Sequence, residues 1–159
     1  MSMEIYVLSP RQLNSIEDWQ KAIDAEGFSL QLNTERPFER LQGFLPARWQ
    51  DSQAGFECDH WRPRSVVEAY RRAGLDRRWK YCLAFRWGAD ARACLGAYIA
   101  ASAYAKATDG VVFDPDAGRI LTPLQAKQMA AKIEKELPSF ERAMQSMTAQ
   151  IERRLRPPS

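Results

Sequence analysis

The fold is constrained most by residues 79–115, which are predicted to form a strand, a long helix and a second strand. Within residues 79–87 large apolar side chains occupy alternate positions, and Cys82 and Ala84 lie between them. This pattern is typical of a strand that is buried on both faces. We therefore expect a central strand flanked on both sides, with Leu83 and Phe85 nearly fully buried. The alternating residues are Trp79, Tyr81, Leu83, Phe85 and Trp87.

The helix of this unit is predicted to begin after Asp90, a good N-cap residue, and to run to about Thr108. Gly110 is placed to supply a left-handed residue after its end, and residues 111–113 return as a strand. Small residues dominate the helix, so its backbone can approach a sheet closely. The expected contact stripe is Ala91, Cys94, Leu95, Tyr98, Ser102 and Ala105.

The segments before this unit predict a second strand-helix-strand unit. Residues 3–8 and 28–32 have strand patterns, and a helix over 16–26 has Ser15 as its cap and Ile16, Trp19 and Ile23 as its core face. An earlier helix start is predicted at Ser9 and Pro10. The remaining expected elements are a packed loop at 33–52, a strand at 55–61 and a helix at 65–73.

After the central unit, turn residues join 111–113 and 119–121 in a hairpin, and Thr122 caps a helix to about Glu136. Pro138 should kink or restart the helix. The final helix carries an apolar stripe of Phe140, Met144, Met147, Ile151 and Leu155, and residues 156–159 should fray. The fold class expected is one α+β domain over residues 1–159. In it a mainly antiparallel, loosely ferredoxin-like sheet is covered by helices, with further C-terminal helices.

The composition indicates a soluble globular protein, with 45% hydrophobic and 27% charged residues. Glu4 interrupts the apolar run near the N-terminus, and the longest apolar run, at 93–105, is shorter than a bilayer span. We therefore expect a cytoplasmic protein without a membrane partner. The three cysteines have no paired spacing, so disulfides are not expected.

Charge is divided unevenly along the chain, although the net charge is only +3. Residues 1–60 contain ten acidic and five basic residues, whereas residues 61–159 contain eighteen basic and ten acidic residues. The folded molecule is therefore expected to have surfaces of opposite charge.

The residues that could carry chemistry are few, and they predict no cofactor and no metal. His60 is the only histidine, and neither a Rossmann, a Walker nor a nucleophile-elbow motif occurs. Glu57 and Asp59 share one strand face and could act as an acid-base pair in a small hydrolase with His60. The alternative is that they are solvated charges that protect a sheet edge. Cys58 and His60 share the other face, where a side-by-side cysteine and histidine is a simpler interpretation than a nucleophilic dyad.

A basic segment at residues 62–80 leaves nucleic-acid binding open as an alternative function. Its cations are flanked by Trp61 and Trp79, and such a mixture can pair with phosphates and stack on bases. Glu68 and Asp76 interrupt the run, which favours a solvated helix face over nucleic acid as the partner. The cations are Arg62, Arg64, Arg71, Arg72, Arg77, Arg78 and Lys80.

Four short motifs resemble a family of small bacterial immunity proteins. They are GFLP at 43–46, GFECDHW at 55–61, FRWG at 85–88 and TDGVVFDPDAGRIL at 108–121. Proteins of that family are associated with polymorphic-toxin and type VI secretion loci. The resemblance implies a cytoplasmic toxin inhibitor that binds its cognate toxin domain and is not itself an enzyme; it transfers no contact residues.

The acidic excess of the first sixty residues indicates where such a partner would bind. We expect a basic toxin surface to meet carboxylates from this part of the chain, with Trp49 or Trp61 as an apolar anchor. The predicted partner-binding residues are Glu17, Asp18, Asp24, Glu35, Glu39, Trp49, Glu57, Asp59 and Trp61.

Overall fold

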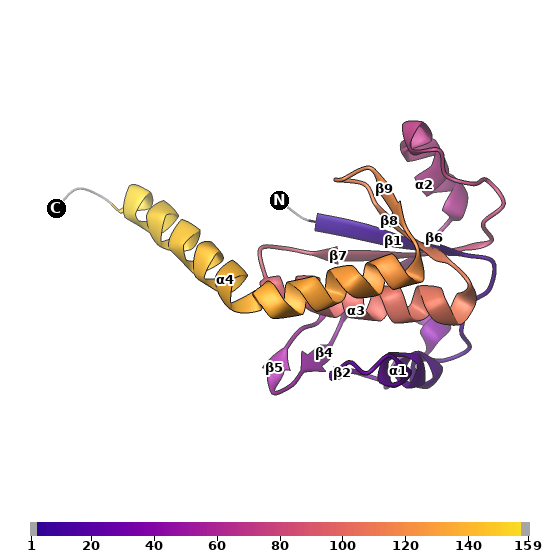
Figure 1. Cartoon of the computed structure of the whole chain (residues 1–159), viewed down its shortest axis with the longest axis horizontal. Coiled ribbons are helices and arrows are strands. Elements are labelled where there is room, and N and C mark those ends of the chain that lie inside the picture. Colours follow the sequence, from indigo (N-terminus) through magenta and orange to yellow (C-terminus); the bar gives the residue numbers. More distant parts are fainter. Residues whose placement is uncertain (1–2, 157–159) are drawn as a thin grey trace.

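A computed structural model describes residues 3–156, apart from the side chain of Met144, so residues 157–159 of the predicted frayed tail lie outside the described part. The protein has an α+β fold built on a six-stranded sheet, and all neighbouring strands in this sheet are antiparallel (Figure 1). The mainly antiparallel sheet that the sequence predicts is therefore confirmed. Its strands, in sheet order, are β3 (Phe44–Leu45), β6 (Phe56–Trp61), β7 (Tyr81–Trp87), β1 (Met3–Ser9), β8 (Val111–Asp114) and β9 (Arg119–Leu121).

Strand β7 lies between β6 and β1, as predicted for the central strand. Leu83 and Phe85 are 2% and 0% exposed, which confirms that they are buried. The strand begins at Tyr81 and not at Trp79, because the Asp76 side chain accepts a 2.8 Å hydrogen bond from the Arg78 backbone and holds a turn just before it. Trp79 is only half-buried as a result.

Helix α3 (Ala91–Thr108) is the centre of the hydrophobic core. The Asp90 side chain accepts hydrogen bonds from the backbone of Arg92 and Ala93, which confirms the predicted cap. Fourteen of the eighteen helix residues are buried, so the predicted single contact stripe was too narrow. The helix is enclosed because the larger sheet, α1 and α4 all pack against it. A helix that is apolar around its whole circumference is typical of such a position.

The chain leaves α3 through Asp109, whose φ of 58° makes it the left-handed residue, so the assignment of this role to Gly110 was wrong. Gly110 is required for another reason. A Cβ atom there would lie 2.5 Å from the Leu8 carbonyl oxygen, so only glycine lets the chain pass this close to β1. Strands β7 and β8 both pair antiparallel with β1 and therefore run parallel to each other, with α3 as their crossover.

Helix α1 (Ile16–Ala25) has the predicted cap at Ser15 and buries Ile16, Trp19 and Ile23. The earlier helix start predicted at Ser9 is wrong, because the Ser9 hydroxyl donates to the Arg11 carbonyl and no helix follows before Ile16.

The strand-helix-strand unit predicted for residues 3–32 is also wrong in its second strand. β2 (Leu30–Leu32) joins a separate small sheet with β4 (Ala47–Trp49) and β5 (Ser52–Gln53). The Gln20 side chain bonds the Leu30 carbonyl and the Leu32 amide, so one edge of β2 is held by α1 and not by a strand. Six of the twenty residues of the predicted loop at 33–52 belong to short strands.

The other face of the larger sheet is covered by α2 (Pro63–Ala69) and the 3₁₀ turn η2 (Arg71–Ala73), which ends at left-handed Gly74. A second, smaller core lies beneath them and uses the sheet residues that point away from α3. It contains Tyr6, Leu8, Val66, Val67, Leu75, Cys82, Ala84 and Phe113. A second 3₁₀ turn, η1 (Phe38–Arg40), lies beside α1.

Helix α4 (Pro123–Leu155) is one continuous helix, although Pro138 lies inside it. Thr122 and Gln125 form the predicted capping box. Figure 1 shows the helix bending about halfway along its length, so that its second half leaves the body of the protein. Pro138 explains the bend, because proline removes a helical hydrogen bond and crowds the preceding turn. The predicted kink is therefore confirmed.

Candidate binding surfaces

Five of the seven predicted partner-binding carboxylates lie on α1, on η1 or in the segment between them. The Trp19 and Phe38 rings meet edge to face, with centroids 6.4 Å apart, and this contact holds η1 beside α1. Among the residues that the structure describes, no ion pair engages any of the five. We call this set the α1/η1 acidic surface: Glu17, Asp18, Asp24, Glu35 and Glu39.

Glu57 and Asp59 do not belong to that surface. On β6 the Cys58 side chain points into the core around α3, the core that also contains the buried face of α1. Neighbouring strand residues point to opposite faces, so Glu57 and Asp59 face the α2 side of the sheet. The seven carboxylates predicted to bind the partner therefore lie on two different faces of the protein. The alternation along β6 shows that Glu57 and Asp59 share a face. Only the packing of α1 shows that this face is the one opposite α1.

The three residues of the hydrolase alternative are not brought together. Asp59 accepts a 2.8 Å hydrogen bond from the Gly43 backbone and so anchors the chain at the start of β3. His60 Nε2 lies 2.7 Å from the Phe38 carbonyl oxygen, which can only accept, so Nε2 carries a proton. His60 lies on the opposite face of β6 from Glu57 and Asp59. Burial raises the pKa of the neighbouring Cys58 thiol well above its usual value, which disfavours a thiolate nucleophile.

The two tryptophans proposed as anchors differ in accessibility. Trp49 is 8% exposed and belongs to the core around α3, so its proposed role as an anchor is wrong. Trp61 is half-buried, and its ring packs against Tyr6 with centroids 5.4 Å apart. The Arg86 guanidinium lies 4.7 Å from the Trp61 ring centre in a cation-π contact. Trp61 therefore keeps part of its surface available on the α2 side of the sheet.

A polar cluster that the sequence did not predict lies beside Trp61. Glu4 and Arg86 are register partners on β1 and β7, with their charged atoms 3.4 Å apart. The Tyr70 hydroxyl donates a 2.8 Å hydrogen bond to Glu4. Burial and the Glu4 charge together raise the pKa of Tyr70. Tyr70 and Arg86 are 66 and 82 positions away from Glu4 in the chain, so the strand register and the packing of α2 on the sheet bring them together.

The arginines of the basic segment gather around a cavity of about 460 Å³ beside α2, which we call the arginine cavity. Arg64 is paired with Glu68 at 3.0 Å, so one of the four guanidinium groups is neutralised within the protein. The aromatic side chain of Trp79 forms part of the wall. The four arginines are Arg62, Arg64, Arg71 and Arg77.

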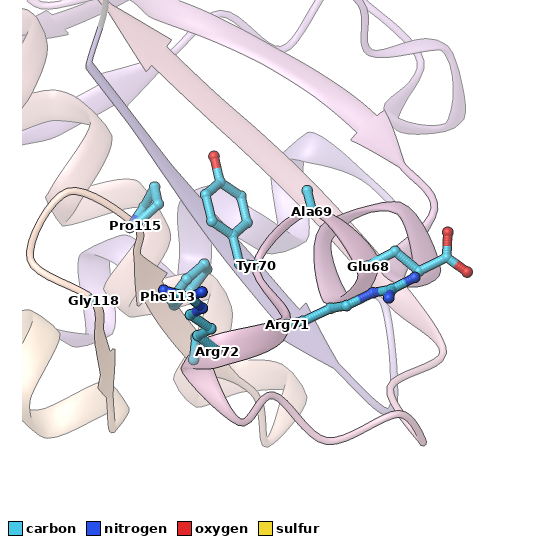
Figure 2. Close-up of a pocket in the computed structure, with 9 residues that line it drawn as sticks. Glu68, Ala69, Tyr70, Arg71, Arg72, Phe113, Pro115 and Gly118 are labelled. Atoms are coloured by element: carbon cyan, nitrogen blue, oxygen red, sulfur yellow. The ribbon is translucent and has the colours of Figure 1, made fainter.

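A second cavity of about 490 Å³ lies between η2 and the turn of the β8-β9 hairpin. Figure 2 shows Arg72 pointing toward Phe113 in this cavity, whereas Arg71 points away toward Glu68. Arg71 and Glu68 line both cavities, so the two hollows adjoin along one ridge. Arg78 is not part of them and is paired with Asp76 at 3.0 Å.

Two kinds of feature are absent from the described part of the chain. Within residues 3–156 no group of three or more histidine, cysteine, aspartate or glutamate side chains is arranged to hold a metal ion. In the same range no helix combines the length and the apolar character that crossing a bilayer requires. Comparisons of the chain with protein-family models, with curated proteins and with solved structures find no match.

Proposed function

We propose that the protein is an immunity protein that binds a secreted bacterial toxin domain in the cytoplasm and blocks it stoichiometrically. The observation that carries this proposal is the α1/η1 acidic surface, whose five carboxylates form no ion pair with any cation of the described residues. Unpaired carboxylates on a rigid helix attract a basic partner at long range and raise its association rate. The resemblance to immunity proteins supports the same function.

The proposal is tested with the neighbouring reading frames. We expect a frame beside this gene to encode a large secreted protein with a C-terminal toxin domain. Co-expression of that domain should stop growth of a host cell, and this protein should restore growth and co-purify with the domain in equal amounts. Failure to protect against or bind the adjacent toxin, or a purely metabolic neighbourhood, would contradict the proposal.

The binding face is tested by charge reversal. Glu17 and Glu39 are exposed and make no side-chain hydrogen bond or ion pair within the described residues, so Glu17→Lys with Glu39→Lys should leave the fold intact. This double variant should bind the toxin more slowly and with less dependence on salt. The matched control, Arg71→Glu with Arg72→Glu, should change binding little. The reverse result would place the interface on the arginine side.

The arginine cavity favours a second candidate function, the binding of single-stranded nucleic acid. Three guanidinium groups without an ion pair among the described residues, those of Arg62, Arg71 and Arg77, can pair with phosphates around this hollow, and Trp79 can stack a base. This candidate predicts that affinity for mixed-sequence RNA or DNA falls steeply between two salt concentrations. Arg62→Ala with Arg77→Ala should weaken binding, and for a single strand the salt slope should fall by about 0.7 for each phosphate that is no longer neutralised.

Arg40 and Arg119 provide a matched control for that titration, because both are exposed arginines that do not line the arginine cavity. Arg40→Ala with Arg119→Ala removes the same charge and should leave the binding curve nearly unchanged. Equal weakening by the two double variants would show that net charge alone causes the binding. Absence of binding at low salt would eliminate this candidate.

A further inference from the structure

The half of α4 that projects beyond the body of the protein exposes large apolar side chains to solvent. Figure 1 shows this half extending beyond the sheet and the other helices. Four large apolar side chains among its described residues, which we call the projecting stripe, are Phe140, Met147, Ile151 and Leu155, with exposures of 42%, 62%, 53% and 78%. An isolated helix of this length is marginally stable in water, so a partner that covers the stripe would stabilise it.

The projecting stripe continues a row that is already buried in the first half of the helix. Ala126, Ala130, Ile133 and Leu137 follow one another at steps of three and four residues, and all are buried where α4 packs on α3. Phe140, position 144, Met147 and Ile151 continue the same steps without interruption. A sustained row of this spacing is the pattern by which two helices pack as a coiled coil.

The packing of this row against α3 ends beside the first turn of α3. Arg92, in that turn, forms an ion pair with Glu141 of α4, so the two helices are still in contact at this point. Before Glu141 the helix α4 has α3 to pack against, whereas beyond it α4 leaves the body of the protein (Figure 1). The apolar row is thus packed against α3 up to about Glu141, and it is exposed from there to Leu155.

We infer that the projecting stripe pairs with the same stripe of a second copy of this chain, as an antiparallel two-helix coiled coil around a two-fold axis near Met147. Such an axis makes the interface self-complementary, with each Met147 facing its counterpart. Phe140 of each chain then lies near the last turn of the other helix. This inference is independent of the proposed function.

The charges along the helix favour the antiparallel direction. The projecting segment carries Glu141 and Arg142 near its start, and Glu152, Arg153 and Arg154 near its end. Around an axis at Met147, antiparallel pairing places Glu141 of one copy beside Arg153 of the other, and Arg142 beside Glu152. It also opposes the two helix dipoles, whereas parallel pairing would bring the arginine clusters together.

The test is sedimentation velocity with light scattering on the full chain across the micromolar range. We expect a concentration-dependent dimer of twice the chain mass, and we expect Met147→Glu with Ile151→Glu to be monomeric. The matched control is Gln145→Glu with Ala149→Glu, which adds the same two charges four residues apart on the opposite side of the helix and should still dimerise. Circular dichroism checks that the sheet and α3 remain folded in each variant.

A second variant tests the direction of pairing. Arg153→Glu with Arg154→Glu should raise the dimer dissociation constant at least several-fold, because the new carboxylates would face Glu141 of the other copy. A wild-type chain that stays monomeric throughout the range overturns the inference. So does a dimer that survives the stripe substitutions, or one that Arg153→Glu with Arg154→Glu leaves unchanged. The inference is also overturned if a monomeric chain binds a toxin domain through the projecting stripe, because the stripe would then be the binding site for that partner.

Discussion

The indole Nε1 of Trp19 donates a 2.9 Å hydrogen bond to the backbone carbonyl oxygen of Ala100, in the middle of the buried helix α3. The ring also meets Phe85 and Tyr104 edge to face, with centroids 5.9 and 5.3 Å apart. Trp19 therefore connects α1 to the central helix and to the central strand. Its side chain is thus one of those that fix where α1 lies on the core, together with Ile16 and Ile23.

Replacing Trp19 with phenylalanine should lower the free energy of unfolding by about 2–3 kcal/mol, because the substitution removes this hydrogen bond and leaves a cavity. Urea denaturation followed by circular dichroism measures the change. Trp61→Phe is the matched control, since Trp61 is only half-buried and has no side-chain hydrogen bond within the described residues. Equal losses in the two variants would contradict the role given to Trp19.

Phe85→Ala should cost about 3–5 kcal/mol, because Phe85 is fully buried on the central strand between the sheet and α3. That is a large share of the stability of a domain of this size, so the variant should be unfolded or nearly so at 25 °C. Thermal unfolding of Phe85→Leu should show a smaller loss. Phe44→Ala, at a ring that is 43% exposed, should lose much less than Phe85→Ala. A Phe85→Ala protein as stable as Phe44→Ala would refute the packing of the central strand.

Glu26 should make folding stability depend on pH in the acid range. Its carboxylate lies 2.7 Å from Lys106 and 2.7 Å from Lys127, and the Lys106 hydrogen bond, followed by that of Lys127, lowers its pKa below the ordinary value of 4.5. Because the folded pKa is lower than the unfolded one, the stabilisation is fully present above pH 4.5. It is lost as the pH falls through the folded pKa.

Glu26→Gln should therefore be less stable than the wild type at pH 7 and should lose less stability between pH 6 and pH 3. Urea midpoints at several pH values measure both effects. Glu17→Gln is the control, since Glu17 is exposed and has no ion pair among the described residues. If Glu26→Gln followed the wild-type pH profile, the two lysines would not stabilise the ionised form.

Local patterns in the sequence determined most of the helices and the central strand. Asp90 and Thr122 are strong caps, and the alternation in residues 81–87 could belong only to a strand, so these elements are present as predicted. One error arose where the local sequence allowed two different hydrogen-bonding roles for the same residue. Ser9 could cap a helix or bond the Arg11 carbonyl, and its place at the end of β1 decided for the second.

The binding surfaces were predicted less well than the elements, because a surface depends on which faces meet in space. The charge division was visible in the sequence, but it could not separate Glu57 and Asp59 from the carboxylates of α1. That separation follows from Cys58 pointing toward α3. Trp49 looked like a loop residue available to a partner, and the small sheet buried it.

The sequence by itself determined which segments are helix or strand and which are acidic or basic, because those properties depend on spacing along the chain. Tertiary structure alone decided that four arginines share one cavity, and that fourteen of the eighteen residues of α3 are buried. It also decided that the apolar row of α4 is buried up to Leu137 and exposed beyond it. Each of these results depends on contacts between residues far apart in the chain, and no local pattern encodes the distance between them.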